Sequence, residues 1–355
     1  MTRAHGSWVA ALALALAPAW APPWAGAAAD PNQAIIDVVG RVAPAVVELQ
    51  VVSAGPAAQI LGRERRGTGV LVDGRGHILT ANYLVAGAEE ITVTLADGRR
   101  ALAGVAGTDP ESGLGVLRMP ALPNLPHVPL GRSQDLKLGQ LVVSLASQGG
   151  TKRTLGAGLV SGLPEFVGYW EYRLPRAIQT NIATLAGGTG APLVDAAGTV
   201  VGVMAYSESD QPQVSFGIPV EHIAGVFEEL VREGRVKNRA PRPWLGLMAV
   251  PAREGVGVAG VTPGGPADRA DLRPRDIITQ LNGKPLAGRD EFFAAIWKGQ
   301  VGDVFDLTVL RADELISVKV RSRDRVEFFQ PPHPATPGPL PPAPAGEAPR
   351  PSGAR

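Results

Sequence analysis

Residues 67–82 read GTGVLVDGRGHILTAN, and this stretch decides the class of fold. Two short runs rich in Val, Leu and Ile flank the turn DGRG at 73–76, whose glycines can take the positive φ of a tight hairpin. Similar short runs precede and follow it, at 45–52, 91–98 and 114–119, and they are separated by Gly and Asp. Strands this short at this spacing predict a mainly-β protein, built as a sandwich or a barrel.

A second set of short apolar runs follows the proline-rich segment 119–130, at 139–147, 154–163, 177–183, 191–206 and 214–219. Two sets of strands joined in this way predict two β-barrels packed together. Helical spacing of apolar residues predicts one helix at 31–42 and another, which closes the second barrel, at 220–236. Residues 241–327 mix short strands and short helices, as a smaller domain with its own core would.

The composition of the chain limits its chemistry. A length of 355 residues suits more than one domain, and 45% hydrophobic residues are enough for sizeable cores. The formal net charge of +1 gives no electrostatic reason to expect a nucleic-acid partner. The chain contains no cysteine, which excludes disulfides, thiolate zinc sites and cysteine nucleophiles. No metal or other cofactor is expected.

Both ends of the chain differ from the middle. Residues 1–29 combine Arg3, an apolar run and the small residues at 27–29, which is the plan of a cleaved secretory signal peptide. An uncleaved membrane anchor is the alternative, but Pro18, Pro22 and Pro23 interrupt the apolar run. Residues 329–355 are rich in Pro, Ala and Gly, which predicts a solvated, disordered tail.

The ordered set of motifs resembles the HtrA/Deg family of periplasmic trypsin-like proteases that carry a PDZ domain. The stretches that carry the resemblance are GTGVLVDGRGHILTANYLV, VAGTDPESGLGVLR, AIQTNIATLAGGTGAPLVDAAGTVVGV, WLGL and GGPADRADLRPRDIITQLNGKPL. The resemblance implies a trypsin-like double β-barrel at 30–239 and a PDZ domain at 240–328. It also implies a periplasmic location, peptide or unfolded-protein partners, and the possibility of a homotrimer.

The chain departs from the family at the positions of the catalytic triad. Tyr83 stands in the place of the histidine, Gly113 in that of the aspartate and Thr189 in that of the serine. A hydroxyl needs a base within hydrogen-bond reach, and the base needs an orienting partner. A phenol with a pKa near 10 is no base at neutral pH, and glycine has no side chain. The sequence therefore predicts a former active site.

No histidine of the sequence stands at a catalytic position. His77, His127, His222 and His333 lie outside the catalytic positions and are expected to be ordinary surface or capping residues. A dyad of Thr189 with Lys137 or Lys152 stays open as an alternative, and Asp109, before Pro110, is expected to form a turn. Gly187, Gly188 and Thr189 are expected to curl their amides into a cradle like an oxyanion hole.

The PDZ-like part keeps its binding features better. PDZ domains add a peptide C-terminus to a sheet edge and hold its carboxylate with backbone amides. Gly246 and Leu247 would supply these amides, and Leu245, Leu247, Phe292 and Ile296 would line the pocket, although some of them are also expected in the core. Arg275 occupies a position where the family usually has glycine, which puts the shape of its loop in question.

Three functions of different classes follow. The leading hypothesis is a non-catalytic envelope protein that binds peptides or unfolded proteins as a chaperone, adaptor or regulator. The alternatives are an active endopeptidase with a rearranged site around Thr189, and a structural factor in an envelope complex. An assay of casein cleavage with a fluorophosphonate probe separates the first two.

Overall fold

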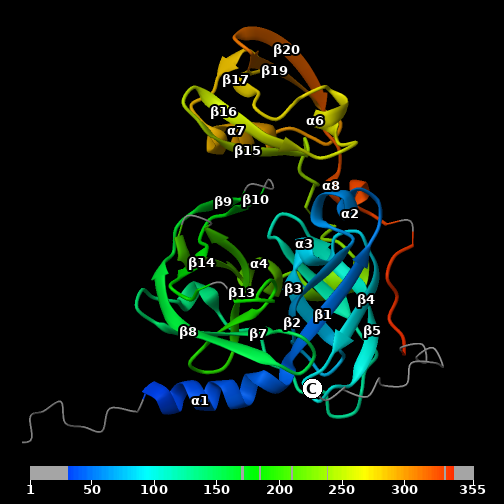
Figure 1. Ribbon diagram of the computed structural model, residues 1–355, viewed down its shortest axis with the longest axis vertical. Coiled ribbons are helices and arrows are strands. Elements are labelled where there is room, and N and C mark those ends of the chain that lie inside the picture. Colours follow the sequence, from blue (N-terminus) through cyan, green and yellow to red (C-terminus); the bar gives the residue numbers. More distant parts are fainter. Residues whose placement is uncertain are drawn as a thin grey trace, which may run out of the picture.

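The computed structural model describes residues 31–168, 172–183, 185–208, 211–237, 239–331 and 333–339. The expected signal peptide at 1–29 and the tail from residue 340 lie outside these residues. The described chain is mainly β, with two barrels side by side and a third, smaller unit placed above them (Figure 1).

The first closed barrel has the strand order β1-β2-β3-β6-β5-β4. The hairpin predicted at 73–76 is confirmed, because Val70 pairs with Leu79 across it and Gly76 takes a φ of 87°. The strands are β1 (Val46–Ser53), β2 (Glu64–Leu71), β3 (His77–Ala81), β4 (Ala88–Thr94), β5 (Arg100–Asp109) and β6 (Leu114–Arg118).

The second closed barrel has the order β11-β14-β13-β12-β7-β8. One buried cluster extends from the first barrel to Val143, Leu145 and Val194 of the second, so a hydrophobic interface joins the two. The strands are β7 (Leu141–Ser147), β8 (Arg153–Gly162), β11 (Ile178–Thr180), β12 (Pro192–Asp195), β13 (Val200–Glu208) and β14 (Gln211–Pro219).

Short helices surround the barrels. The predicted helix at 31–42 is confirmed as α1 (Pro31–Val42). The single helix expected at 220–236 is instead two, α4 (Glu221–Ala224) and α5 (Phe227–Glu233), because the chain breaks at Gly225 and Val226. The others are α2 (Gly55–Leu61), α3 (Asn82–Val85) and the 3₁₀ turns Ala43–Ala45 and Ser133–Asp135. No helix of the described residues is both long and apolar enough to cross a membrane.

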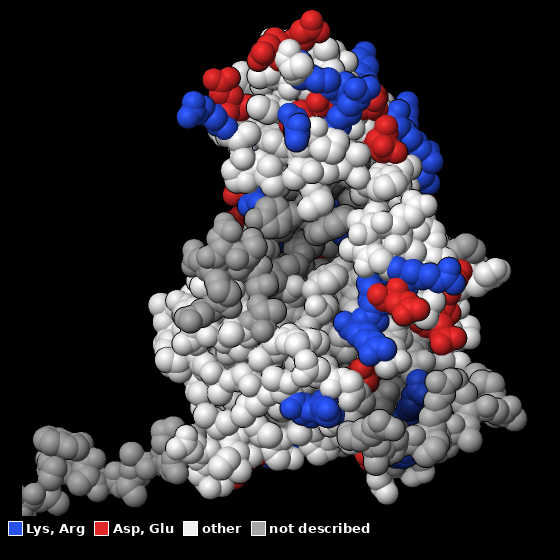
Figure 2. Space-filling model, viewed as in Figure 1, with Lys and Arg blue, Asp and Glu red and all other residues white. Residues whose placement is uncertain are grey.

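The third unit is a sheet of order β15-β16-β17-β19-β20, with β18 paired to β17. Its core is separate from that of the barrels and contains Phe292, Phe293 and Ile296, all fully buried. Its elements are β15 (Leu247–Ala252), β16 (Gly255–Val261), α6 (Pro266–Arg269), β17 (Ile277–Leu281), β18 (Lys284–Pro285), α7 (Arg289–Ile296), β19 (Val304–Arg311), β20 (Glu314–Arg321) and α8 (Arg325–Phe328). Charged side chains of both signs gather on this unit, whereas the visible face of the second barrel carries few (Figure 2).

Arg275, in the loop before β17, has a backbone conformation that favours glycine. The Arg275 backbone takes a φ of 80°, in the left-handed region that favours glycine, and its amide donates to the carbonyl oxygen of Val258 at 2.8 Å. Arginine is therefore accommodated at the cost of backbone strain.

Replacing Arg275 by glycine is expected to stabilise the protein. The left-handed backbone costs an ordinary residue ~1–2 kcal/mol, and glycine avoids this cost. Glycine also loses more conformational entropy on folding, which offsets part of the gain, so a net increase of roughly 1 kcal/mol in the free energy of unfolding is expected. Urea unfolding of Arg275→Gly measures the gain. The control is Arg253→Gly, at an exposed turn residue that is not in the left-handed region, and it is expected to destabilise. A lower free energy of unfolding in Arg275→Gly would contradict the inference that the Arg275 backbone is strained.

A small hairpin of β9 (Phe166–Gly168) and β10 (Tyr172–Leu174) projects from the second barrel toward the third unit (Figure 1). Phe166 pairs with Leu174, and both pack with the barrel core, where the Phe166 ring lies 4.8 Å from that of Phe216. Val167, on the opposite face of the strand, belongs to the core cluster of the third unit and is 6% exposed. The two faces of one strand therefore belong to two different cores.

The segment after α8 returns to the first barrel. Ala335 donates its amide to Ala88 at 3.1 Å, and Gly338 and Leu102 exchange hydrogen bonds of 2.9 and 3.1 Å. Figure 1 shows this segment, in red, running beside β4 and β5. Where the sequence predicts a solvated tail from residue 329, the described part of that tail makes ordered contacts.

Candidate functional site between the barrels

The candidate site lies where the two barrels meet. Tyr83 is on α3, directly after β3, while Thr189 is in the turn before β12. Thr68 on β2 joins the two barrels here. Its amide donates to the carbonyl oxygen of Thr189 at 2.8 Å, and its hydroxyl donates to the carbonyl oxygen of Gly187 at 2.7 Å. Tertiary hydrogen bonds from the first barrel thus fix the loop that holds Thr189.

The side chains of Tyr83 and Thr189 meet directly. The Tyr83 hydroxyl lies 2.8 Å from the carbonyl oxygen of Ala205 and 3.2 Å from Oγ1 of Thr189. A phenol has one proton and a carbonyl oxygen only accepts, so the shorter contact takes the phenol proton. At the longer contact the phenol oxygen accepts, and Thr189 donates. The threonine proton is therefore held by a weak acceptor, which does not activate the hydroxyl.

The pKa of Tyr83 strengthens this conclusion. Burial raises the pKa of the phenol, and the hydrogen bond with Thr189 lowers it by less, so the net shift is upward. Tyr83 is thus a neutral phenol at neutral pH and has no capacity to remove a proton from Thr189.

Arg65 on β2 positions the helix that carries Tyr83. Its guanidinium donates to the carbonyl oxygens of Leu84, at 3.0 Å, and of Ala86, and to Oγ of Ser53 at 2.5 Å. Burial lowers the pKa of Arg65 to about 10, which still leaves it charged at neutral pH. These bonds satisfy carbonyl groups at the end of a helix of a single turn.

Gly113 lies next to the same helix. Its carbonyl oxygen accepts from the amide of Asn82 at 2.8 Å, and its φ is 79°. The positions of Tyr83, Gly113 and Thr189 are therefore close in space, as the resemblance implies, but Gly113 supplies only backbone groups.

The loop before β12 departs from the expected cradle of amides. Gly187 takes a φ of 71°, and a Cβ there would lie 2.3 Å from the carbonyl oxygen of Ser147. The amide of Gly188 donates to the carbonyl oxygen of Leu185 at 2.8 Å, because the chain turns back on itself at this point. Gly188 is thus occupied and does not offer its amide to an oxyanion, contrary to the expected three-amide arrangement.

The remaining candidates lie outside this site. His77 is buried rather than at the surface, and its Nδ1 lies 2.7 Å from Oδ2 of Asp73. Burial lowers the pKa of His222. Within the described residues, no hydrogen bond or ion pair joins Thr189 to Lys137 or Lys152. No group of three or more described His, Asp or Glu residues is placed to hold a metal ion.

The expected peptide-binding residues of the third unit are brought together. Gly246 takes a φ of 77°, and the side chains of Leu245, Leu247, Phe292 and Ile296 belong to one cluster. All four side chains are at most 2% exposed, so they are core residues rather than an open pocket. Val167 of the hairpin is part of the same cluster, a contact that the sequence did not indicate.

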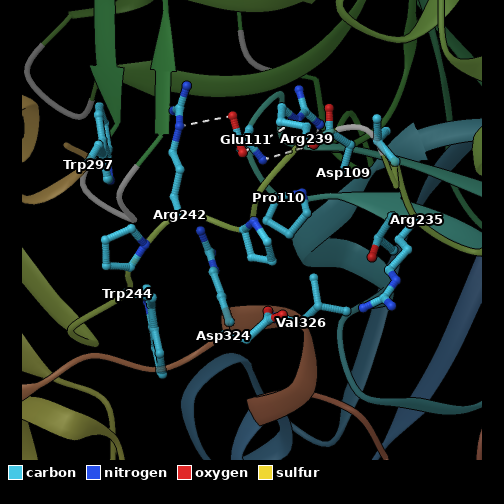
Figure 3. Close-up of a pocket in the computed structure, with 15 residues that line it drawn as sticks. Asp109, Pro110, Glu111, Arg235, Arg239, Arg242, Trp244, Trp297, Asp324 and Val326 are labelled. Atoms are coloured by element: carbon cyan, nitrogen blue, oxygen red, sulfur yellow. Dashed lines mark hydrogen bonds and ion pairs between the residues drawn. The ribbon is translucent and has the colours of Figure 1, made fainter. Parts of the chain in front are cut away.

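A second cluster joins the loop that follows β5, at Asp109 and Glu111, to the linker that precedes the third unit (Figure 3). Asp109, whose side chain is 1% exposed, pairs with Arg239, and Glu111 pairs with Arg242 at 2.9 Å. The turn expected at Asp109 is confirmed, because its Oδ1 accepts from the amide of Glu111 at 3.2 Å. Burial raises the pKa of Glu111 although both arginines lower it. A cavity of about 80 Å³ lies beside these ion pairs.

The fold and the site together define a trypsin-like peptidase domain followed by a PDZ domain. The family model for the trypsin-like peptidase domain matches residues 67–203, and that for the PDZ domain matches residues 243–321. The first range begins within β2 and ends within β13, and the second contains β15 to β20.

The chain belongs to the HtrA/Deg family. It is 30% identical to the putative serine protease HhoA of Synechocystis over 73% of this chain and 72% of that protein. It is 35% identical to protease Do-like 1, chloroplastic, of Arabidopsis thaliana, over 72% of this chain and 64% of that protein. A probable periplasmic serine endoprotease, DegP-like, of Hahella chejuensis is also 35% identical, over 72% of this chain and 56% of that protein. The chain thus spans less than two thirds of the length of the last two relatives.

A solved structure supports the same assignment. The HtrA-type protease AlgW with tripeptide is 28% identical and has a TM-score of 0.51, with 81% of this chain and 96% of that chain covered. The chain is therefore a homologue of serine endopeptidases in which a double barrel precedes one PDZ domain.

Proposed function

We propose that this protein is a non-catalytic member of the HtrA/Deg family, a pseudoprotease of the cell envelope. The contact of Tyr83 with Thr189 and Ala205 carries the proposal. At the position where the family has a base, the oxygen of a neutral phenol accepts a hydrogen bond from the Thr189 hydroxyl, whose proton stays on threonine. Gly113 offers no carboxylate, and the amide of Gly188 is occupied.

The role that remains is binding. The PDZ domain would hold the C-terminus of a peptide or an unfolded protein, with its carboxylate at the amides of Gly246 and Leu247. The cleft between the barrels would contribute a second surface. In this role the protein acts as a chaperone, adaptor or regulator.

Location and assembly are part of the proposal. The apolar run within residues 1–29 and the periplasmic DegP-like relatives support export to the periplasm, by a cleaved signal peptide or with an uncleaved anchor. Leu138, Leu155 and Leu159 are 67%, 47% and 43% exposed on the second barrel, which favours contacts between copies such as a homotrimer.

An active endopeptidase that uses Thr189 is the second candidate, because the relatives are named serine proteases. It requires a base that reaches Thr189 after Tyr83 has moved away. Cleavage of casein decides between the two, and the Discussion gives the expected result.

Peptides with a free, apolar C-terminal residue are expected to bind the full chain with a dissociation constant of about micromolar, or about 8 kcal/mol, of which burial of the terminal side chain contributes roughly 1.5–3 kcal/mol and the strand and carboxylate hydrogen bonds the rest. Amidation of the terminus is expected to weaken binding about ten-fold or more, because it removes a charge-assisted hydrogen bond. Calorimetry with matched free and amidated peptides measures both effects. Equal affinity of the two peptides would show that the carboxylate is not recognised.

The residue exchanges for this test follow from the structure. Ile296 is fully buried, so Ile296→Asp would unfold the domain rather than report on binding. Val167→Ala is more informative, because it removes a side chain of the second barrel from the PDZ cluster. The terminal side chain of a bound peptide would compete with Val167 for this cluster, so Val167→Ala is expected to strengthen binding, whereas Leu155→Ala, on the exposed face of β8, is expected to leave it unchanged.

A further inference from the structure

The segment after the PDZ domain has two anchored ends. At the first, Trp244 packs with the rings of Phe328 and Phe329, at centroid distances of 4.8 and 5.4 Å. Trp244 is 2% exposed and is bridged to Arg323, so this anchor belongs to the base of the PDZ domain. Apolar contacts therefore hold the start of the segment where the PDZ domain begins and ends.

The second anchor is on the first barrel. The exchange of hydrogen bonds between Leu102 and Gly338 is that of an antiparallel strand pair. The pairing of β5 with β6 begins only at Gly104, so this end of β5 has a free edge, and the segment occupies it. Ala335, 7% exposed, packs with the core cluster of the barrels.

The barrel is shaped to receive this segment. A Cβ at Gly104 would lie 2.8 Å from the carbonyl oxygen of Ala335 and 2.8 Å from Cδ of Pro337. Such distances are too short for any side chain, so the close approach requires glycine at this position.

The middle of the segment is less closely packed. A groove of about 420 Å³ separates it from the barrel, with Phe329, Pro331 and Pro334 on one wall and Val85 and Gly107 on the other. A segment that is fixed at its two ends and packed loosely between them has few contacts to lose when one end detaches.

We propose that residues 329–331 and 333–339 form an intramolecular strap that fixes the PDZ domain on the first barrel, and that the free edge of β5 is its receptor. Domains joined by one linker generally move relative to each other. Besides the covalent linker that contains Arg239 and Arg242, the strap gives this PDZ domain a connection to the first barrel that is held by hydrogen bonds and packing. Detachment of the strap from β5 leaves the linker and the contact of Val167 as the described connections and widens the range of positions that the PDZ domain takes, independently of whether the protein cleaves or binds peptides.

The absence of cysteine from the chain allows a direct test of the contact. Paired residues of this kind have Cα atoms about 5.5 Å apart, which suits a disulfide. Leu102→Cys/Gly338→Cys is expected to oxidise within one molecule to near completion. Leu102→Cys combined with Thr336→Cys is the control, because Thr336 is not the residue that pairs with Leu102, and this pair is expected to form less disulfide. Failure of the first pair to form an intramolecular disulfide would overturn the proposal.

A second test measures the position of the PDZ domain. Spin labels at Glu90→Cys on β4 and Glu314→Cys on β20, both exposed, report the distance between the first barrel and the PDZ domain. The full chain and a chain ending at residue 339 are expected to give one narrow distance distribution. A chain ending at residue 330 is expected to lose the narrow peak.

Gly104→Ala reproduces the detachment without truncation. It is expected to lose the narrow peak too, whereas Gly74→Ala, where a Cβ meets no atom within 4 Å, is expected to keep it. Circular dichroism confirms that each variant is folded. An unchanged distribution in both Gly104→Ala and the chain ending at residue 330 would show that the segment does not fix the PDZ domain.

Discussion

Unfolded casein incubated with the purified protein is expected to stay intact, at the rate seen with buffer alone. In a comparable serine protease, loss of the triad lowers the rate about 10⁶-fold. Here the Thr189 hydroxyl donates to Tyr83, and burial keeps the phenol protonated. A fluorophosphonate probe is expected to leave Thr189 unlabelled, because labelling requires the activated oxygen that cleavage requires.

The controls make this result decisive. Thr189→Ala is expected to match the natural protein in both assays, and an active HtrA relative is expected to degrade the casein. Tyr83→Phe removes the phenol oxygen without supplying a base, so it is also expected to be inactive. Cleavage by the natural protein that disappears in Thr189→Ala would establish the endopeptidase and end the pseudoprotease proposal.

Tyr83→His, Gly113→Asp and Thr189→Ser combined in one chain are expected to raise hydrolysis above each single variant by about 10²–10⁴-fold, the range that a positioned base contributes. Each single variant is expected to stay at background, because the groups of a triad act as a unit. Initial rates with a fluorogenic peptide measure the difference.

The structure identifies two obstacles to this recovery. Gly113 has a φ of 79°, where aspartate is tolerated at a cost of roughly 1–2 kcal/mol. The amide of Gly188 stays bonded to Leu185 unless the loop rearranges. If the triple variant folds with the stability of the natural protein but stays at background, the turn in which Gly188 donates to Leu185 is a cause of inactivity in its own right, and the absent triad is not a sufficient explanation.

The sequence was sufficient for the fold because the signals were local. Hairpin glycines such as Gly76, and the alternation of apolar and polar residues over a few positions, decide where strands begin and end. The prediction of one continuous helix at 220–236 was wrong, because the spacing of apolar residues continues through Gly225 although the helical backbone is interrupted there.

The sequence predicts which residues occupy the candidate site but not the hydrogen bonds that hold them in place. The residues at positions 83, 113 and 189 could be read from the sequence, and the structure brings them together. The roles of Thr68, Ala205 and Arg65 could not, because they depend on hydrogen bonds between segments far apart in the chain. Ala205 contributes only its carbonyl oxygen, which no sequence pattern marks. The ordered part of the tail was missed for the same reason, since its composition resembles that of a linker.

The hairpin of β9 and β10 has a consequence for how the molecule unfolds. Phe166 and Leu174 are fixed in the barrels while Val167 is fixed in the PDZ core, on the two faces of one short ribbon. When the PDZ domain unfolds, Val167 loses its surroundings, and when the second barrel unfolds, the ribbon that presents Val167 is lost. The melting of one domain is therefore expected to lower the stability of the other by the contribution of one buried valine, roughly 1.5–3 kcal/mol. An excised PDZ domain would lack Val167 and would expose the core side chains that Val167 contacts.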